Sequence, residues 1–571
     1  MNDFSVILDI DRAVRAHPER DAIATGTGTI SYRRFGEGVA DFVAQLEANT
    51  APGEFIGIEA TRTAGSVVAM VGAMKAGRPF LFIDPRDTAS YSTKINLLGI
   101  TTLARTPAGS EMPVVGVVPA RWRGGSDEPA PSWKQPEAEA DRIAYAIYTS
   151  GSTGEPKCVL VRGEPLGTVI RDHVERLAMD PTCRTLQFAR LTFDGCITEI
   201  LWTLTAGACL VVLDEEHLTP GSVLQNTLER FRVTHVKTTP FALTATTPTR
   251  NTSLRHVING GGACRQAVLR KWSSVAVFHN AYGTTETTIC NLLSGRLDPD
   301  AWADSVPLGE FVGDGGYRID PIPGAVRPAL AAGTDIRGEL VLTGDCVALG
   351  YLTPHGTQLF LDGTGDRVYR TGDIVERRTG QIFYVERLDR QMKVRGYRLD
   401  PGEVESAACG LGGVDEAVVT AESHDDTYAS DADALVCYYV GTATVRDVRA
   451  HLEKVLDSYK VPSVIEHIGT MPYTRNGKVD RDALRVSRHR TAPAGGDDAP
   501  AERVLAAVRQ LTGTVDVGLD DNFFEVGGDS ASAVLLVGTL RQLGWMDVGV
   551  RDVLRAENLK ALVAPLPDRG V

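Results

Sequence analysis

The chain has 571 residues, of which 43% are hydrophobic and 23% are charged, and its net charge is −14. This length exceeds what one hydrophobic core supports and predicts several domains. The acidic balance argues against nucleic-acid binding, because phosphate backbones repel an acidic surface. No apolar run approaches the roughly 20 residues of a bilayer span, and no basic and apolar secretory signal opens the chain. With nine scattered cysteines and no Cys-x-x-Cys pair, we expect a cytoplasmic protein with neither nucleic-acid nor membrane partners.

The chain divides by composition into four parts. Up to about residue 388, β-rich apolar runs such as 143–148, 257–258 and 275–278 alternate with helix-like stretches and lead into Gly-rich or polar turns. This pattern predicts a large α/β domain with ligands near its strand ends. A smaller α+β subdomain is expected over 389–486. Residues 487–500, SRHRTAPAGGDDAP, have the composition of a linker. Helical spacing of Leu505, Val508 and Leu511 predicts a short helical domain over 501–571.

The segment 148–157, YTSGSTGEPK, follows the apolar run 143–148 directly. Its glycines allow backbone amides to approach an anion, its hydroxyls add donors, and Lys157 supplies a positive charge. The spacing from glycine to lysine differs from that of the P-loop of nucleotide hydrolases. The segment therefore predicts a phosphate-contacting loop of a different type, whereas a flexible surface turn is the alternative.

Six further motifs occur along the chain. They are AMKAG at 73–77, FDGCITE at 193–199, NAYGTTE at 280–286, YRTGD at 369–373, RLDRQMKVRG at 387–396 and PYTRNGKVDR at 472–481. Together with 148–157, and in this order, they resemble the adenylation domains of nonribosomal peptide synthetases in the adenylate-forming superfamily. The resemblance implies a multidomain α/β fold that uses ATP and magnesium to activate a carboxylic acid, here an amino acid, as an acyl-AMP.

The resemblance also implies roles for single residues. A carboxylate that attacks the α-phosphate builds up negative charge, which the enzyme must stabilise with positioned cations. Lys478 is implied as the catalytic cation, and Glu286 as the magnesium ligand, a role that suits carboxylate oxygen. Asp389 and Arg390 would form the hinge between the two adenylation parts. The residues implied for ATP or AMP binding are Thr149, Ser150, Gly151, Ser152, Thr153, Lys157, Gly260, Gly261, Asn280, Ala281, Tyr282, Gly283, Thr285, Asp373, Tyr384, Arg387 and Lys478.

A second signal lies near the C-terminus, in DNFFEVGGDS at 521–530. Taken alone, Ser530 after two glycines indicates a helix N-cap. The paired phenylalanines, the glycines, the Asp-Ser pair and the following apolar helix resemble a peptidyl carrier domain of four helices. Ser530 would then carry covalent phosphopantetheine, attached by a phosphopantetheinyl transferase. The expected domains are an adenylation core over 1–388, its C-terminal subdomain over 389–486, a linker over 487–500 and a carrier over 501–571.

The specificity pocket follows from aligning the motifs. Asp194 matches the position that binds a substrate α-ammonium, although a helix cap is its alternative. Lys237 lies on an expected pocket strand, where a buried ammonium needs a partner unless it reaches solvent. A Thr–Lys pair at these positions resembles pockets for aspartate and asparagine, while Gly195 and Ala281 leave room for a derivative; threonine and 2,3-diaminopropionate stay open. The implied substrate-binding residues are Asp194, Gly195, Thr198, Lys237, Ile258, Gly260, Ala281, Ile289 and Cys290.

Two rival functions make different predictions. An acyl-coenzyme A ligase would lack a carrier motif and an ammonium-binding aspartate, yet Ser530 and Asp194 are present. A non-catalytic interaction protein would have lost residues such as Lys478, Glu286 or Asp373, yet all three are retained. We therefore expect a stand-alone adenylation–thiolation loading module for secondary metabolism. Its aminoacyl thioester would pass to separate tailoring or condensation enzymes, and an MbtH-like protein is a further possible partner.

Overall fold

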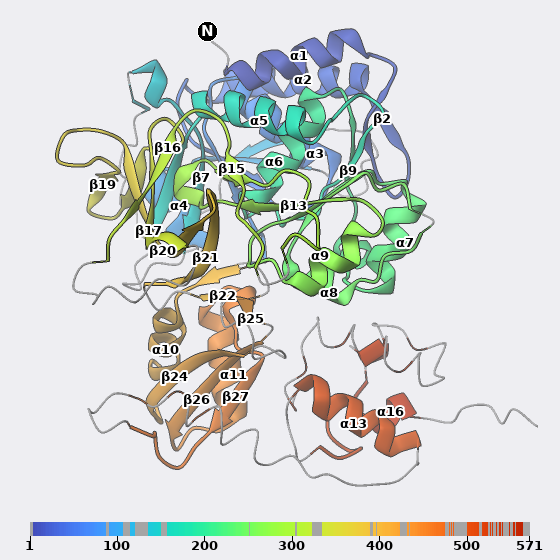
Figure 1. The fold of residues 1–571 in the computed structure, drawn as a ribbon, viewed down its shortest axis with the longest axis vertical. Helices are drawn as coiled ribbons and strands as arrows, with labels where there is room; N and C mark the ends of the chain where they lie inside the picture. Colours follow the sequence, from blue (N-terminus) through green and yellow to red (C-terminus); the bar gives the residue numbers. More distant parts are fainter. Residues whose placement is uncertain are drawn as a thin grey trace, which may run out of the picture.

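The computed structural model describes most of the large domain and parts of the C-terminal region. The described residues are 4–86, 91–106, 115–119, 135–136, 138–149, 157–250, 252–302, 305–322, 334–388, 392–394, 397–422, 431–432, 434–473, 479, 481, 484, 500–512, 517–523, 526, 528, 533, 536–537, 540, 548, 552–553 and 556–563. Among them, alternating helices and strands form a large domain, a smaller α+β subdomain and a helical C-terminal domain (Figure 1). The predicted multidomain α/β architecture is confirmed.

The first sheet of the large domain positions most of the site. Its order is β15-β14-β13-β12-β11-β9-β10-β1-β2, and the strands from β13 to β1 run parallel. The bounds are β1 (Asp21–Ala24), β2 (Thr29–Ser31), β9 (Arg184–Leu186), β10 (Cys209–Val211), β11 (His235–Thr238), β12 (His256–Asn259), β13 (Val277–Tyr282), β14 (Leu292–Leu293) and β15 (Glu310–Phe311).

The second sheet has a parallel centre and antiparallel edges, in the order β19-β18-β8-β7-β4-β3-β5-β6. Its strands are β3 (Ile56–Glu59), β4 (Phe80–Ile83), β5 (Thr102–Arg105), β6 (Gly116–Pro119), β7 (Ile143–Thr149), β8 (Lys157–Arg162), β18 (Gly350–Thr353) and β19 (Gly356–Leu359). The predicted apolar run 143–148 is therefore β7, which is buried over its first five residues.

Two apolar helices lie in the core of the large domain. All residues of α3 (Ala64–Lys75) except the last are buried, as are nine consecutive residues of α6 (Gly195–Thr205). A helix that is apolar on all sides must be covered on all sides. Amphipathic α1 (Ser5–Ala16), α2 (Tyr32–Asn49) and α5 (Glu164–Arg176) pack on them from outside (Figure 1). The other helices of this domain are α4 (Tyr91–Leu98), α7 (Ser222–Arg230), α8 (Pro240–Ala245), α9 (Gln266–Ser273), η1 (Glu139–Asp141), η2 (Glu215–Leu218) and η3 (Thr285–Thr287).

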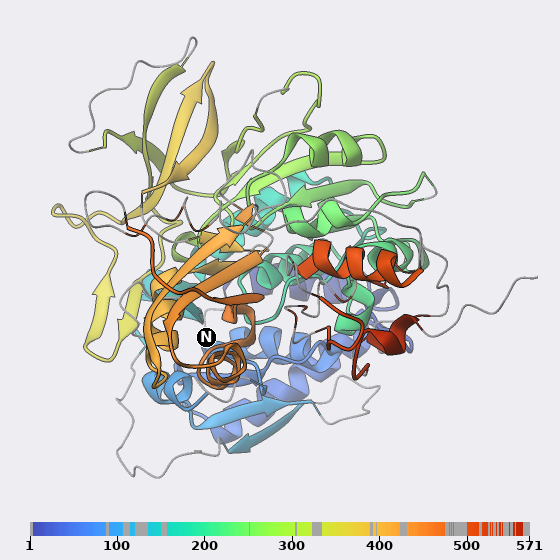
Figure 2. The same cartoon turned by 90° about the horizontal axis from the view of Figure 1, so that it is seen from below.

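A four-stranded antiparallel sheet completes the large domain and leads to the junction. It consists of β16 (Gly316–Asp320), β17 (Thr334–Thr343), β20 (Val368–Arg378) and β21 (Gln381–Arg387). The smaller subdomain follows, with β22 (Met392–Val394), β23 (Tyr397–Leu399), β25 (Asp431–Ala432), β24 (Val414–Glu422), β26 (Ala434–Gly441), β27 (Val464–His467), α10 (Pro401–Cys409), α11 (Val445–Val455) and η4 (Ser458–Lys460). Figure 2 shows this subdomain from below.

The sheet β24-β26-β27 of the smaller subdomain has two different apolar faces. One face packs with Val394 and Leu399 of the β22–β23 hairpin and with α10 and α11. The other face packs with Met471, Val479 and Leu484. Met471 and Val479, which precede and follow Lys478 in the sequence, therefore lie on the face opposite the hairpin.

The C-terminal domain has a small apolar core of its own. It includes α13 (Pro500–Thr512), which begins at the last residue of the predicted linker, and α16 (Lys560–Val563). Phe523 of the carrier-like motif is buried in this core, and a Cβ at Gly528 would lie 2.3 Å from its ring. The Asn522 amide donates to the carbonyl oxygens of Ala556 (2.9 Å) and Glu557 (3.2 Å). Gly528 and Phe523 therefore fix the turn against the helices.

All nine cysteines are free, and seven of them are buried, as expected from their scattered positions.

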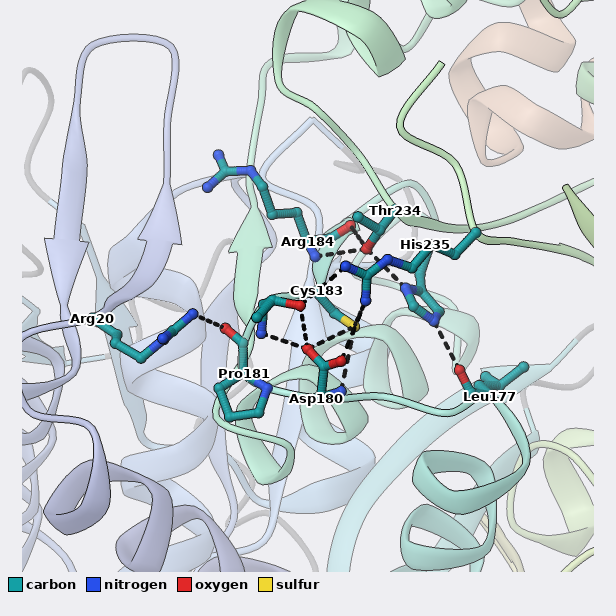
Figure 3. A network of polar contacts seen from close by, with 10 residues as sticks. Arg20, Leu177, Asp180, Pro181, Cys183, Arg184, Thr234 and His235 are labelled. Carbon is teal, nitrogen blue, oxygen red and sulfur yellow. Dashed lines mark hydrogen bonds and ion pairs between the residues drawn. The ribbon is translucent and has the colours of Figure 1, made fainter. Parts of the chain in front are cut away.

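A closed polar network occupies the amino ends of β9 and β11 (Figure 3). The Thr234 hydroxyl accepts from the Arg184 amide at 2.8 Å and pairs with His235 Nδ1 at 2.9 Å. The other ring nitrogen of His235 lies 2.9 Å from the Leu177 carbonyl oxygen. Nearby, the Asp180 carboxylate accepts from Thr182 and from Arg255. This end of the sheet is thus tied together by contacts within the protein.

Candidate active site

The carboxyl ends of three neighbouring strands bring the predicted substrate residues together. Lys237 on β11 lies in register with Ile258 on β12, and Ala281 is near the end of β13. Gly260 follows β12 directly, and Gly195 and Thr198 lie in the first turn of α6. Parallel strands end at one edge of a sheet, which is where ligands of α/β proteins bind.

The Lys237 ammonium points at α6. Its Nζ donates to the Thr198 hydroxyl at 2.8 Å and lies 5.8 Å from the centre of the Trp202 ring. A Cβ at Gly260 would lie 3.2 Å from Lys237 Cε, so glycine leaves room for the lysine stem. In this structure the half-buried lysine therefore directs its ammonium toward α6.

Two carboxylates lie within the electrostatic reach of Lys237. Burial raises the pKa of Asp194, which immediately precedes α6, while a hydrogen bond from Thr285 and the charge of Lys237 lower it. Burial raises the pKa of Glu199 to about 7, opposed mainly by Lys237. The Glu199 carboxylate accepts backbone N–H groups of Phe188 (3.0 Å) and Ala189 (3.1 Å), and so fixes the segment that leads to Asp194.

Two buried polar groups near Lys237 have no hydrogen-bond partner among the described residues. They are Trp202 Nε1 and His173 Nε2, whose rings lie 5.7 Å apart. Burial lowers the pKa of His173 to about 4, so the ring is neutral, and its Nδ1 donates to the Val169 carbonyl at 2.7 Å. Nε2 is then an acceptor, whereas the indole is a donor. We name Asp194, Thr198, Glu199, Trp202, Lys237 and His173 the lysine cluster.

Ile289 and Cys290 lie on a strained turn after η3. Thr288 and Ile289 have φ values of 63° and 77°, which are uncommon outside glycine and costly for a β-branched residue. A Cβ at Gly283 would lie 1.9 Å from the Ile289 carbonyl oxygen, so only glycine permits this approach. Cys290 is buried behind the turn. The glycine of the NAYGTTE motif thus serves packing between the end of β13 and the Ile289 segment.

The predicted ribose residues form a second, paired group. Asp373 on β20 and Arg387 on β21 are cross-strand partners, and Arg387 Nη1 donates to Asp373 Oδ1 at 2.6 Å. The Tyr282 hydroxyl donates to Asp373 Oδ2 at 2.5 Å. We name Tyr282, Asp373 and Arg387 the ribose cluster. Asn280 accepts from Asn259 and donates to the Pro307 carbonyl, and Tyr384 packs in the neighbouring apolar cluster.

The ends of the phosphate-loop segment are adjacent. Thr149 ends β7 and is the cross-strand partner of Lys157, which begins β8. Lys157 Nζ lies 5.7 Å from the centre of the Tyr351 ring, and the Tyr351 hydroxyl donates to Glu286. The loop ends and the predicted metal ligand are therefore brought together.

Glu286 is fully buried, and its carboxylate accepts hydrogen bonds from the large domain and from the smaller subdomain. Tyr351 donates to it at 2.6 Å, and Arg398 Nη1 on β23 lies 3.2 and 3.1 Å from its two oxygens. Burial raises its pKa, but the Arg398 charge and the Tyr351 hydrogen bond outweigh this, so the pKa is lowered and the group is ionised. Among the described residues no three His, Cys, Asp or Glu side chains form a metal site. An ionised single carboxylate suits magnesium, which commonly combines one or two carboxylates with substrate phosphates.

Several predicted residues lie outside the described residues. They are Ser150, Gly151, Ser152, Thr153, Asp389, Arg390, Lys478 and Ser530. Gly261, which adopts a left-handed φ of 82°, and Thr285 are described, at the turn after β12 and in η3.

Sequence reasoning missed three contributors to the site. Trp202 lies one helical turn after Thr198, so its i, i+4 spacing could have revealed it. His173 and Arg398 come from distant segments and left no local signal.

Family models match nearly the whole chain. Residues 10–352 match the AMP-binding enzyme family, 403–478 the AMP-binding enzyme C-terminal domain and 502–566 the phosphopantetheine attachment site. The first match alone covers more than half of the chain.

Two curated relatives and a solved structure match over nearly the whole chain. Novobiocin biosynthesis protein H of Streptomyces niveus is 34% identical, over 94% of this chain and 91% of its own length. Bacitracin synthase 3 of Bacillus licheniformis is 30% identical over 95% of this chain, but the chain spans only 9% of that protein. A solved structure of holo-PA1221, an NRPS protein with adenylation and PCP domains, has a TM-score of 0.78 and 24% identity, and covers 98% of this chain and 96% of its own.

A search of the described helices for one long and apolar enough to cross a bilayer found none.

The order of the three matched families, the residues gathered at the strand ends and the full-length relative agree: the chain belongs to the AMP-binding enzyme family and is an ATP-dependent, AMP-forming ligase of the nonribosomal peptide synthetase type, with an adenylation domain joined to a phosphopantetheine carrier domain.

Proposed function

We propose that this loading module activates aspartate, or asparagine or a close derivative, and transfers it to its own phosphopantetheine arm on Ser530. The observation that carries the proposal is the inward Lys237 ammonium, 2.8 Å from the Thr198 hydroxyl. A substrate carboxylate or amide oxygen would pair with this ammonium, whereas an aliphatic side chain would leave it facing apolar groups. Asp194 would hold the α-ammonium.

The unpaired groups of the lysine cluster favour a polar substrate side chain further. Trp202 Nε1 offers a donor and His173 Nε2 an acceptor, and both are buried with no hydrogen-bond partner in the described part of the chain. Buried polar groups normally have partners, and leaving them unpaired costs free energy. A carboxamide can accept from Lys237 and donate to His173, which is why asparagine remains beside aspartate. Threonine and 2,3-diaminopropionate are the remaining candidates.

The ribose cluster and Glu286 support the nucleotide roles. We propose that Asp373 binds the ribose hydroxyls, that Tyr282 stacks on adenine, and that Glu286 holds magnesium, which neutralises phosphate charge when bound. Lys157 and the segment 150–153 would contact phosphates, and Lys478 would stabilise charge at the α-phosphate. The junction at Asp389 and Arg390 would act as the hinge. A tailoring or condensation enzyme in trans, and an MbtH-like protein, are proposed partners.

The test is pyrophosphate exchange with aspartate, asparagine, glutamate, 2,3-diaminopropionate, threonine and valine. Wild type should favour aspartate, then asparagine, by roughly 100-fold or more over valine. Lys237→Met should lower exchange with aspartate strongly and narrow the gap to valine. Exposed Lys454 on α11 provides a matched control, Lys454→Met, with unchanged selectivity.

A preference for a cationic or aliphatic amino acid would contradict the assignment of Lys237. The adenylation and carrier assignments would survive that result, because they depend on other residues.

A further inference from the structure

The β22–β23 hairpin of the smaller subdomain reaches the predicted metal ligand of the large domain. Val394 and Leu399 anchor the hairpin in the core of its own subdomain. Because side chains alternate along a strand, Arg398 projects to the opposite side from Leu399. There its guanidinium contacts both oxygens of Glu286, at 3.1 and 3.2 Å. This ion pair therefore joins the two parts of the adenylation unit at the active site.

Further contacts seat the same hairpin beside the substrate segment. The Tyr397 ring lies 4.8 Å from that of Phe193, which directly precedes Asp194, and 5.4 Å from the Arg190 guanidinium. Tyr459 of η4 also packs against Phe193, at 5.3 Å. Asp457 lies 3.7 Å from Lys94 of the large domain. Arg398 is thus one contact of a defined interface, and it is the one that ends on a buried carboxylate.

The Glu286 carboxylate has limited capacity for partners. Tyr351 already donates to Oε1, and Arg398 Nη1 spans both oxygens. A divalent cation on the same oxygens would stand next to the guanidinium in a buried site, where like charges repel strongly. Glu286 can therefore pair with Arg398 or bind a cation, but not both. No other cation within ion-pair distance of Glu286 is found among the described residues.

The two partners belong to different arrangements of the smaller subdomain. Met471 and Val479, which precede and follow Lys478 in the sequence, pack on the sheet face opposite the hairpin, and Tyr473 forms a bridge with Val479. An arrangement that places Arg398 on Glu286 thus turns the sheet face that carries Met471 and Val479 away from the hairpin contact. The cation-binding state of Glu286 belongs to adenylate formation under the proposed function, on which this inference rests.

We propose that Arg398 is a positioning residue for thioester formation: it takes the place on Glu286 that a divalent cation takes during adenylate formation. Glu286 then couples cation occupancy to the position of the smaller subdomain. No additional covalent step is involved. In thioester formation the thiolate attacks the acyl carbonyl, and AMP leaves with the electron pair of the broken bond. Arg398 acts on this step by holding the hairpin in place.

The first test separates the two half-reactions in the full holo-chain. Arg398→Gln should slow single-turnover transfer from the adenylate to the arm by about 10-fold, while pyrophosphate exchange stays within about twofold. Arg398→Lys keeps the charge and should recover part of the transfer rate. Arg446→Gln, an exposed change on α11 of the same subdomain, is the matched control and should alter neither rate.

The second test follows the position of the hairpin by hydrogen exchange and does not depend on enzyme activity. Hydrogen exchange of peptides covering 392–399 should be slow in wild type without magnesium and faster when Mg²⁺ is titrated with a non-hydrolysable ATP analogue. Arg398→Gln should speed exchange at zero magnesium and lower the Mg²⁺ midpoint by about fivefold, since linkage is reciprocal.

Equal loss of both half-reactions in a folded Arg398→Gln protein, or unchanged transfer, would overturn the proposal. A hydrogen-exchange rate of the hairpin that changes neither with the substitution nor with Mg²⁺ would also overturn it. Absence of wild-type exchange activity with aspartate and asparagine would instead reject the proposed substrate, and the hydrogen-exchange result would still decide the role of Arg398.

Discussion

The two ends of strands β11, β12 and β13 differ in how their polar groups are paired. At the amino ends of β11 and β12, His235 stacks on His256 with ring centres 4.8 Å apart, and His256 stacks at 5.2 Å on His279, the third residue of β13. Both ring nitrogens of His235 contact a hydroxyl or a main-chain oxygen, whereas His279 contacts the Ser294 carbonyl oxygen through Nδ1 and His256 Nδ1 through Nε2. At the carboxyl ends, by contrast, Lys237 lies beside Trp202 and His173, which carry unpaired buried polar atoms.

The comparison separates polar groups that serve the fold from those that await a ligand. A buried polar group that has protein partners stabilises the fold or leaves its stability unchanged. An unpaired buried polar group lowers the stability of the fold, and such groups persist at functional sites. Both kinds of polar group lie on the same three strands, so the composition of these strands does not show which end binds a ligand. We therefore expect changes at the carboxyl ends, and in segments that act there, to alter chemistry more than stability, and changes at the amino ends to do the reverse.

The largest effect is expected for Ser530→Ala. The hydroxyl is the proposed attachment point for phosphopantetheine, so its removal should abolish covalent loading while adenylate formation continues. Intact-mass measurement after incubation with a phosphopantetheinyl transferase should show the added arm in wild type only. A variant that gains the arm, or a wild type that never does, would contradict the carrier assignment of this serine.

The next effect concerns Lys478→Ala. Loss of a positioned cation from a charged transition state should lower adenylate formation by on the order of 100-fold or more, with ATP binding largely retained. Pyrophosphate exchange measures the rate, and nucleotide titration measures binding. The melting temperature should not change, as expected for a residue that serves chemistry. Exchange at the wild-type rate would remove Lys478 from the active site.

Much of the fold and part of the site could be predicted from the sequence. The apolar run 143–148 is β7, and the spacing of Leu505 and Val508 is that of α13. Lys237 and Thr198 were paired by motif alignment, and the structure places them in contact. The strand and the helix were predictable because each depends on a local pattern of apolar residues, whereas the pocket role of Lys237 and Thr198 stays a prediction.

The contacts that were missed depend on distant parts of the chain. Arg398 and Glu286 are 112 residues apart, and their pairing depends on how one subdomain sits on another. Glu199 lies within the FDGCITE motif, but its role could not be predicted, because its partners are main-chain N–H groups, which carry no sequence signal. His173 reaches the lysine cluster only because α5 packs on α6.

The smallest expected effect is on the pH dependence of stability, which arises from the histidines at the amino ends of β11 and β12. Burial lowers the pKa of His235 to about 4 and that of His256 to about 3, with Arg255 adding to the shift in both. An unfolded histidine has a pKa of about 6.5, so below that pH the unfolded chain binds protons that the folded protein does not. The stability contributed by the neutral rings is therefore complete above pH 6.5 and is lost as pH falls toward 4.

His235→Gln should reduce this pH dependence because the amide does not titrate. Between pH 7.5 and 5.0, the melting temperature of wild type should fall by about 3 °C more than that of the variant. Scanning fluorimetry of both proteins across this range measures the difference, and His355→Gln, a substitution in the β18–β19 turn outside the stack, serves as the control. Pyrophosphate exchange at pH 7.5 should be nearly unchanged, because Lys237 lies two residues further along the strand, at its other end. If the melting temperatures of wild type and His235→Gln fell equally with pH, the histidine stack would not disfavour protonation. The two strand ends would then differ in hydrogen bonding but not in their effect on charge.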